Sequence, residues 1–171
     1  MKAAFKLIDK LLAESHRPMN VMVLDKVLTF GIPFNAPHGF KIQSINEHEI
    51  VIKLPNRRLN HNHLGGIHAC AIATLGEFCG GLGLLKSFGI SKYRLIMSEL
   101  KAEYKYQGRK ALTGKSQIQF DKDKIQNDID TTGKSTQTVS TTIYDEDSQV
   151  VAIVTTTWQI KKWDLVKTKN Q

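Results

Sequence analysis

The chain has 171 residues, a length that fits a single domain with room for a hydrophobic core. Its 41% hydrophobic and 23% charged residues are typical of a globular protein. The formal net charge of +8 would suit an anionic partner, but Lys and Arg are spread along the chain without an RGG tract or zinc-finger spacing, which argues against dedicated nucleic-acid binding.

Two helices are predicted at the N-terminus, because apolar residues recur at helical spacing over residues 2–13 and again over about residues 20–30. Arg17 and Pro18 separate them. Charged residues interrupt the first apolar stretch, so a secretory signal is not predicted. We expect residues 1–33 to be an N-terminal helical extension.

The main domain is predicted over residues 34–165, followed by a C-terminal tail of residues 166–171. Its first part, from residue 38 to residue 55, is rich in β-favouring residues, and Asn46 and Glu47 indicate a hairpin turn. The sequence therefore predicts two strands before the long apolar segment.

A long helix over roughly residues 66–87 is expected next, and then more strands. Turn residues at 107–109 and 145–148 indicate hairpins, while the polar residues 121–134 are expected to form an exposed loop. The four strand candidates are residues 93–107, 110–120, 135–145 and 149–163. This order predicts an α+β fold in which a consecutive antiparallel meander wraps around the central helix.

The central helix contains one formally charged side chain, Glu77, in the seventeen residues from Ala69 to Leu85. This segment is shorter than the roughly 20 residues needed to span a membrane, so no membrane span is predicted. An unpaired buried carboxylate is costly, so Glu77 either has a partner distant in sequence or serves chemistry. Its neighbours one turn away are all small: Ala73, Thr74, Gly80 and Gly81. Such neighbours allow close approach of a ligand, or of another helix with a lysine satisfying Glu77.

The two cysteines, Cys70 and Cys79, lie on this same helix. A rise of 1.5 Å per residue separates them by roughly 13 Å, too far for a disulfide within the helix. The chain is therefore interpreted as reduced and cytoplasmic.

The loop of residues 62–68 leads into the N-terminus of the central helix, where unpaired N–H groups can stabilise an oxyanion. His68 and Glu77 are nine residues apart, so one helix places them roughly 13 Å apart on opposite sides. They can act on one substrate only if a second subunit supplies one of them. A homodimer or homotetramer with neighbouring central helices would do so.

The spacing Asn62-x-x-Gly65-x-x-His68, with the acid Glu77 nine residues further on, resembles the hotdog-fold acyl-CoA thioesterases of the PaaI type. Their signature is N-x-x-G-x-x-H-G-G with an acid nine residues after the His. The resemblance implies a hotdog fold and hydrolysis of an acyl-CoA or similar thioester at a site between two subunits. It implies no cofactor, since coenzyme A is part of the substrate.

The resemblance also assigns roles. Asn62 would orient or polarise the thioester carbonyl, His68 would shape the loop, and the N–H of Ala69 would bind the oxyanion. Glu77 of the other subunit would activate water or attack the carbonyl. Substrate-binding residues are expected at Gly65, Gly66, Thr74, Gly80 and Gly81. Candidates for contacts with coenzyme A phosphates or for a second polar group are Lys92, Arg94, Arg109 and Ser98.

The family's His-Gly-Gly is His68-Ala69-Cys70 here, and the methyl group of Ala69 could crowd the thioester. This departure leaves a second hypothesis open, a non-catalytic hotdog protein that binds acyl chains or lipids. A third hypothesis is a charge-driven binder of nucleic acid or membrane surfaces. His61 and His63 lie near His68, but no Cys or carboxylate stands at ligand spacing, so no metal site is predicted.

Overall fold

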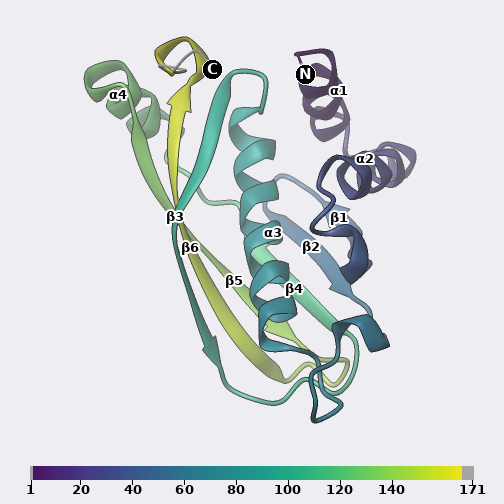
Figure 1. Ribbon diagram of the computed structural model, residues 1–171. Helices are drawn as coiled ribbons and strands as arrows, with labels where there is room; N and C mark the ends of the chain where they lie inside the picture. The colour runs from purple at the N-terminus through teal and green to yellow at the C-terminus, as the bar shows by residue number, and fades with distance from the viewer. Residues whose placement is uncertain (1, 167–171) are drawn as a thin grey trace, which may run out of the picture.

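A six-stranded antiparallel sheet curves around one long helix, α3 (Ala69–Phe88), in the computed structural model, which describes residues 2–166 (Figure 1). The strand order is β1-β2-β4-β5-β6-β3. The strands are β1 (Lys41–Ile45), β2 (Glu49–Leu54), β3 (Tyr93–Tyr104), β4 (Leu112–Gln117), β5 (Ser135–Tyr144) and β6 (Val150–Lys162). The predicted α+β class, with the sheet around a central helix, is confirmed.

The helix α3 lies unusually close to the sheet because glycines face it. A Cβ on Gly76 would lie 2.3 Å from the Cβ of Val154, so only glycine fits there. The carbonyl of Gly76 accepts a 3.0 Å hydrogen bond from the hydroxyl of Thr141 on β5. Although α3 is long and apolar enough to cross a membrane by length and composition, most of its residues are buried inside this fold, so it is a core helix.

The predicted consecutive meander is wrong, because β3 does not pair with β4. Instead β3 pairs antiparallel with β6, from Tyr93 opposite Lys162 to Tyr104 opposite Ala152. The segment between β3 and β4 passes beneath the N-terminus of α3 and leads from the edge of the sheet to β4, which lies between β2 and β5 (Figure 1). There the carbonyl of Gly108 accepts a 2.7 Å hydrogen bond from the N–H of Ile67. The glycine turn at 107–109 therefore serves a crossover rather than a hairpin.

The expected exposed loop over residues 121–134 is also wrong, because it contains α4 (Lys122–Thr132). Asp121 caps the helix by accepting a 2.9 Å hydrogen bond from the N–H of Lys124. Ile125 and Ile129, spaced one turn apart, are buried in a cluster with Leu84 of α3. Two isoleucines at helical spacing are enough to hold an otherwise polar helix against the core.

The two predicted N-terminal helices are confirmed as α1 (Lys2–Ala13) and α2 (Pro18–Gly31). All of their buried residues except Val21 belong to the main core cluster with α3: Ile8, Leu11, Leu12, Leu24 and Leu28. The carboxylate of Asp9 accepts hydrogen bonds from the N–H groups of Ile90 (2.8 Å) and Ser91 (3.1 Å), beyond the C-terminus of α3. The extension is thus fixed on the C-terminal half of α3. Of the predicted tail, residues 167–171 lie outside the described residues.

The two edges of the sheet differ. At one edge β1 is short, and α2 packs against it. At the other edge β3 is twelve residues long, and no strand among residues 2–166 pairs with the side of β3 that faces away from β6. On β3, Met97, Leu100 and Tyr104 stand opposite buried β6 residues on the face toward α3, yet they are 38%, 37% and 47% exposed. A long edge strand with exposed apolar side chains is a surface suited to pairing with another chain.

Candidate functional site

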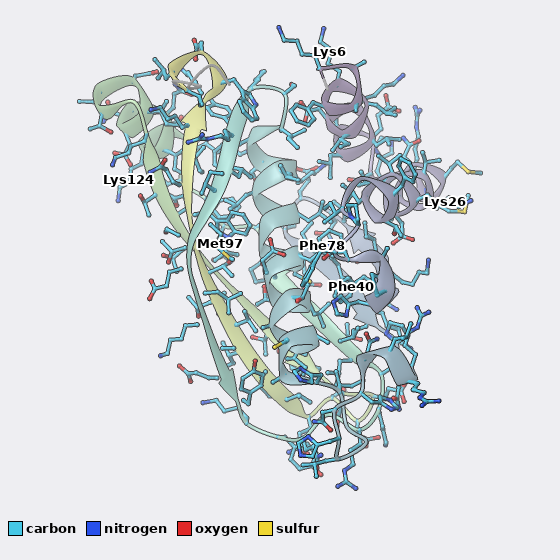
Figure 2. All side chains as sticks on the ribbon, in the orientation of Figure 1. Lys6, Lys26, Phe40, Phe78, Met97 and Lys124 are labelled. Carbon is cyan, nitrogen blue, oxygen red and sulfur yellow. The ribbon has the colours of Figure 1, made fainter. Side chains whose placement is uncertain are left out.

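The carboxylate of Glu77 stands at a pocket of about 390 Å³ between α3 and β3. The floor is one face of α3, with Glu77, Phe78, Gly81, Leu82 and Leu85. Figure 2 shows Phe78 pointing from α3 toward Phe40, with Met97 of β3 on the other side of the helix. The rings of Phe78 and Phe40 have centroids 5.7 Å apart, so aromatic packing fixes this wall of the site.

Burial raises the pKa of Glu77 to about 6, and desolvation is the only cause of this shift. Within residues 2–166, no hydrogen bond or ion pair satisfies the carboxylate, so the alternative in which a lysine pairs with it is not realised within one chain. A carboxylate with a pKa near 6 is largely ionised at neutral pH, yet more basic than an ordinary glutamate. These properties suit a general base.

The 62–68 loop is built by the side chain of Asn62. Its Oδ1 accepts hydrogen bonds from the N–H groups of Leu64 (2.9 Å) and Gly66 (3.2 Å), which closes the turn. Gly65 has φ +75°, a left-handed conformation that favours glycine. Asn62 and Gly65 therefore shape the loop, and a direct contact between Asn62 and a substrate stays a prediction.

His68 is the N-cap of α3, as its Nδ1 accepts a 3.1 Å hydrogen bond from the N–H of Cys70. Because Ala69 is the first residue of the helix, its N–H has no intrahelical acceptor. The residue is also exposed. The carbonyl of Ala69 accepts a 2.9 Å hydrogen bond from the hydroxyl of Tyr104, at the end of β3. The helix N-terminus is thus held in place, and the N–H of Cys70 is engaged by His68.

Asn60 is a positioning residue that the sequence pattern did not reveal. It is buried, and its Nδ2 donates to the carbonyls of His38 (2.9 Å) and Pro55 (3.0 Å). The backbone carbonyl of Asn60 accepts a 2.7 Å hydrogen bond from the backbone N–H of His68. Asn60 lies outside the spacing that singles out Asn62, so no local pattern marks it. Asn35, which lines the Glu77 pocket, likewise belongs to no motif in the sequence.

Within one chain, the predicted residues form two separate groups. Gly81 lines the pocket with Glu77, while the 62–68 loop and Ala69 lie at the other end of the site, at the N-terminus of α3. Gly80 faces the sheet, where an added Cβ would lie 3.1 Å from the Thr156 hydroxyl, and the Thr74 hydroxyl donates to the carbonyl of Cys70. Substrate contacts of Gly65, Gly66, Thr74 and Gly80 therefore stay predictions.

Among the other candidates, Arg94 lines the Glu77 pocket, and its Nε is buried without a hydrogen-bond partner. Lys92 is exposed, and the Nε of Arg109 donates to Gln107. The hydroxyl of Ser98 donates to the carbonyl of Thr157 at a bulge in β3. The described part of the chain has no group of three or more His, Cys, Asp or Glu residues placed to hold a metal ion.

A protein family described as Domain of unknown function (DUF4442) matches residues 22–160. The chain belongs to this family. The match begins inside α2 and ends near the end of β6, so it includes every element that lines the Glu77 pocket except α1 and Trp163. No match is found among curated proteins by sequence.

Solved structures resemble this DUF4442 protein over most of its length. One is a protein of unknown function from Pseudomonas aeruginosa, described as a probable thioesterase, with 22% identity, a TM-score of 0.74 and coverage of 82% of this chain and 95% of that one. A thioesterase from Haemophilus influenzae has 14% identity, a TM-score of 0.69 and coverage of 88% and 94%. A mutant thioesterase from Staphylococcus aureus has 20% identity, a TM-score of 0.64 and coverage of 75% and 98%. These likenesses confirm the predicted hotdog fold.

Proposed function

We propose that this DUF4442 protein hydrolyses an acyl-CoA or a related thioester at a site formed between two copies of the chain. The observation that carries the proposal is Glu77, a carboxylate with a raised pKa that faces an apolar pocket without a partner. The thioesterases among the similar folds support the reaction class. The free thiols of Cys70 and Cys79 suit the cytoplasmic location that we propose with it.

The bare edge of β3 supports the two-copy arrangement. Antiparallel pairing of β3 with β3 of a second copy would continue the sheet across the dimer and cover the apolar residues Met97 and Leu100. Such a dimer has a two-fold axis and therefore two equal sites. In each of them, Glu77 of one copy would face the helix N-terminus of the other.

The proposed chemistry uses water and the chain's own groups. The N–H of Ala69 at the helix N-terminus holds the thioester oxygen, on which negative charge develops. Glu77 accepts a proton from a water molecule whose oxygen attacks the carbonyl carbon. The tetrahedral intermediate collapses, the C–S bond breaks, and the thiolate leaves and takes up a proton. In the second route left open by the sequence, Glu77 itself attacks, and water then hydrolyses the resulting anhydride.

Replacing Glu77 tests the function directly. Glu77→Gln is expected to abolish thiol release from every acyl-CoA that the wild type hydrolyses, while the oligomer stays intact. Glu146→Gln is the matched control, because Glu146 is exposed in the β5–β6 turn and pairs only with Lys53 at 3.6 Å. Full activity of Glu77→Gln would remove Glu77 from the mechanism. Saturable acyl-CoA binding without thiol release by the wild type would favour the non-catalytic alternative.

Complementation tests the two-copy site. Glu77→Gln lacks the base, and Ala69→Pro lacks the oxyanion N–H. Co-expressed in equal amounts, they form mixed dimers in half of the cases, and each mixed dimer has one site with both groups intact. Activity should therefore return to about a quarter of the wild-type value, although each variant alone is inactive. If activity does not return, the site is not shared between two copies in the proposed way: either both groups act within one chain, or they do not act in catalysis.

A further inference from the structure

The Glu77 pocket extends along α3 away from the 62–68 loop. Its floor follows one helix face from Glu77 through Gly81 to Leu85. Eight residues at 1.5 Å each give a length of about 12 Å. The pocket therefore has a direction, with the carboxylate at one end and the C-terminal part of α3 at the other.

The N-terminal helices form one long wall of this pocket. Phe5 of α1 and Leu28 of α2 line it, together with Ile32, which follows α2. Leu95 of β3 and Trp158 of β6 line the opposite side. Because Leu28 also belongs to the main core cluster, this wall is a fixed part of the fold.

A stacked pair of aromatic rings closes the end remote from Glu77. The rings of Phe5 and Trp163 have centroids 6.0 Å apart and planes inclined by 21°. The indole N–H of Trp163 donates a 2.8 Å hydrogen bond to the carbonyl of Ile90, which fixes the ring. Residues from the two ends of the described chain thus meet at the end of the pocket.

Only a few of the side chains that line the pocket are polar. Asn35 accompanies Glu77, and the hydroxyl of Tyr93 is engaged by a 2.9 Å hydrogen bond to Gln126. Arg94 also lines the pocket, and its Nε is buried without a hydrogen-bond partner. The remaining lining side chains are mostly apolar, which fits a hydrocarbon chain better than the amide-containing arm of coenzyme A.

We propose that this pocket holds the acyl chain of the substrate, that the pair of Phe5 and Trp163 limits its length, and that the preferred substrates are straight medium-chain acyl thioesters of about eight to ten carbons. A C–C bond of about 1.5 Å projects to roughly 1.3 Å along an extended chain, so 12 Å holds about nine carbons. At roughly 30 Å³ per heavy-atom group, ten carbons occupy about 300 Å³, which fits the 390 Å³ pocket. The orientation, with the carbonyl at Glu77, rests on the proposed function.

The length limit is tested by the rate of thiol release across straight acyl-CoAs from acetyl to hexadecanoyl. The wild type should be fastest with octanoyl- and decanoyl-CoA. Phe5→Ala removes the end wall and should move the optimum to tetradecanoyl or longer chains. Leu7→Ala is the matched control, since Leu7 is on the same helix but 45% exposed and outside the pocket. A profile identical in Phe5→Ala, Leu7→Ala and the wild type would overturn the inference.

Ile32→Phe probes the same pocket in the opposite sense. Ile32 is 36% exposed, so a larger side chain can be accommodated without repacking the core. It should shorten the preferred chain to hexanoyl or less. If instead Phe5→Ala and Ile32→Phe raise KM equally for all chain lengths, the pocket holds the coenzyme A arm and the assignment is wrong.

Binding separates this inference from the reaction. Both tryptophans of the chain, Trp158 and Trp163, line the pocket, so intrinsic fluorescence reports on its occupation. Non-hydrolysable S-alkyl-CoA thioethers should change the fluorescence with the tightest Kd near S-decyl, and Phe5→Ala should shift this optimum to longer chains. This result without any thiol release would refute the hydrolysis and support the pocket. Hydrolysis of acyl-CoA combined with thioether binding that does not depend on chain length would support the reaction and refute the assignment of the pocket to the acyl chain.

Discussion

Replacing Ala69 by proline should remove the proposed oxyanion donor and leave α3 intact. Proline lacks an N–H but is favoured at the first position of a helix, which Ala69 occupies. The preceding His68 has φ −66° and ψ 138°, the extended conformation required before proline. We therefore expect the free energy of unfolding to change by less than about 0.5 kcal/mol.

The effect on catalysis should be far larger. Loss of one oxyanion donor lowers kcat by about 10²–10³-fold, which corresponds to about 2.7–4 kcal/mol of transition-state stabilisation. KM should change little, because the donor acts mainly on charge that develops in the transition state. The assay is thiol release at saturating acyl-CoA, together with denaturant unfolding of each variant.

Ala69→Ser is the matched control, because it adds bulk at the same exposed position but keeps the N–H. We expect it to retain kcat within about threefold of the wild type, or roughly 0.7 kcal/mol. If Ala69→Pro folds normally and hydrolyses the thioester as fast as Ala69→Ser, the N–H of Ala69 does not stabilise the transition state.

Four further predictions concern Glu77, the core and the edge strand. Since Glu77 must be ionised to accept a proton, kcat/KM should rise with pH through about 6 and then level off; an acidic limb near 4.5 would contradict the desolvation. Because the pKa of Glu77 is raised in the folded protein, the free energy of unfolding falls as the pH rises from 4.5 to about 6. At pH 7, Glu77→Gln should therefore stabilise the fold by up to about 2 kcal/mol, measured as a higher urea midpoint. Gly76→Ala should cost about 1–3 kcal/mol by overpacking against Val154, whereas Gly83→Ala, with its nearest neighbours at 3.7 Å, should not destabilise. Leu100→Lys on β3 should give an inactive monomer by light scattering, and an active oligomer would place the interface elsewhere.

The sequence was sufficient to predict the features that depend on local patterns. The apolar run around Glu77 predicts both the core helix and the isolated carboxylate, because burial and desolvation follow directly from composition. Asn46 and Glu49 belong to the predicted hairpin, in which the Asn46 Oδ1 accepts a 2.8 Å hydrogen bond from the N–H of Glu49. The loop before α3 was likewise found from its spacing.

The features that the sequence does not predict depend on contacts between distant residues. Gly108 indicates a turn, but the turn belongs to a crossover from β3 to β4. The crossover is held by a hydrogen bond from the N–H of Ile67, which is distant in sequence. In α4, two isoleucines in a polar segment give too weak a periodic signal by themselves. The pocket wall needs Phe5 and Trp163 side by side, and nothing in either local sequence indicates that these residues meet.

The end of β3 is also fastened to the N-terminus of α3. Tyr104 donates to the carbonyl of Ala69, and just beyond the strand Gly108 accepts from the N–H of Ile67. Pairing of β3 in an oligomer would therefore stiffen the segment that presents the oxyanion donor, besides delivering the second subunit's base. Specific activity should then fall on dilution in proportion to the fraction of assembled protein, which makes the abundance of the chain in the cell a control on its own turnover.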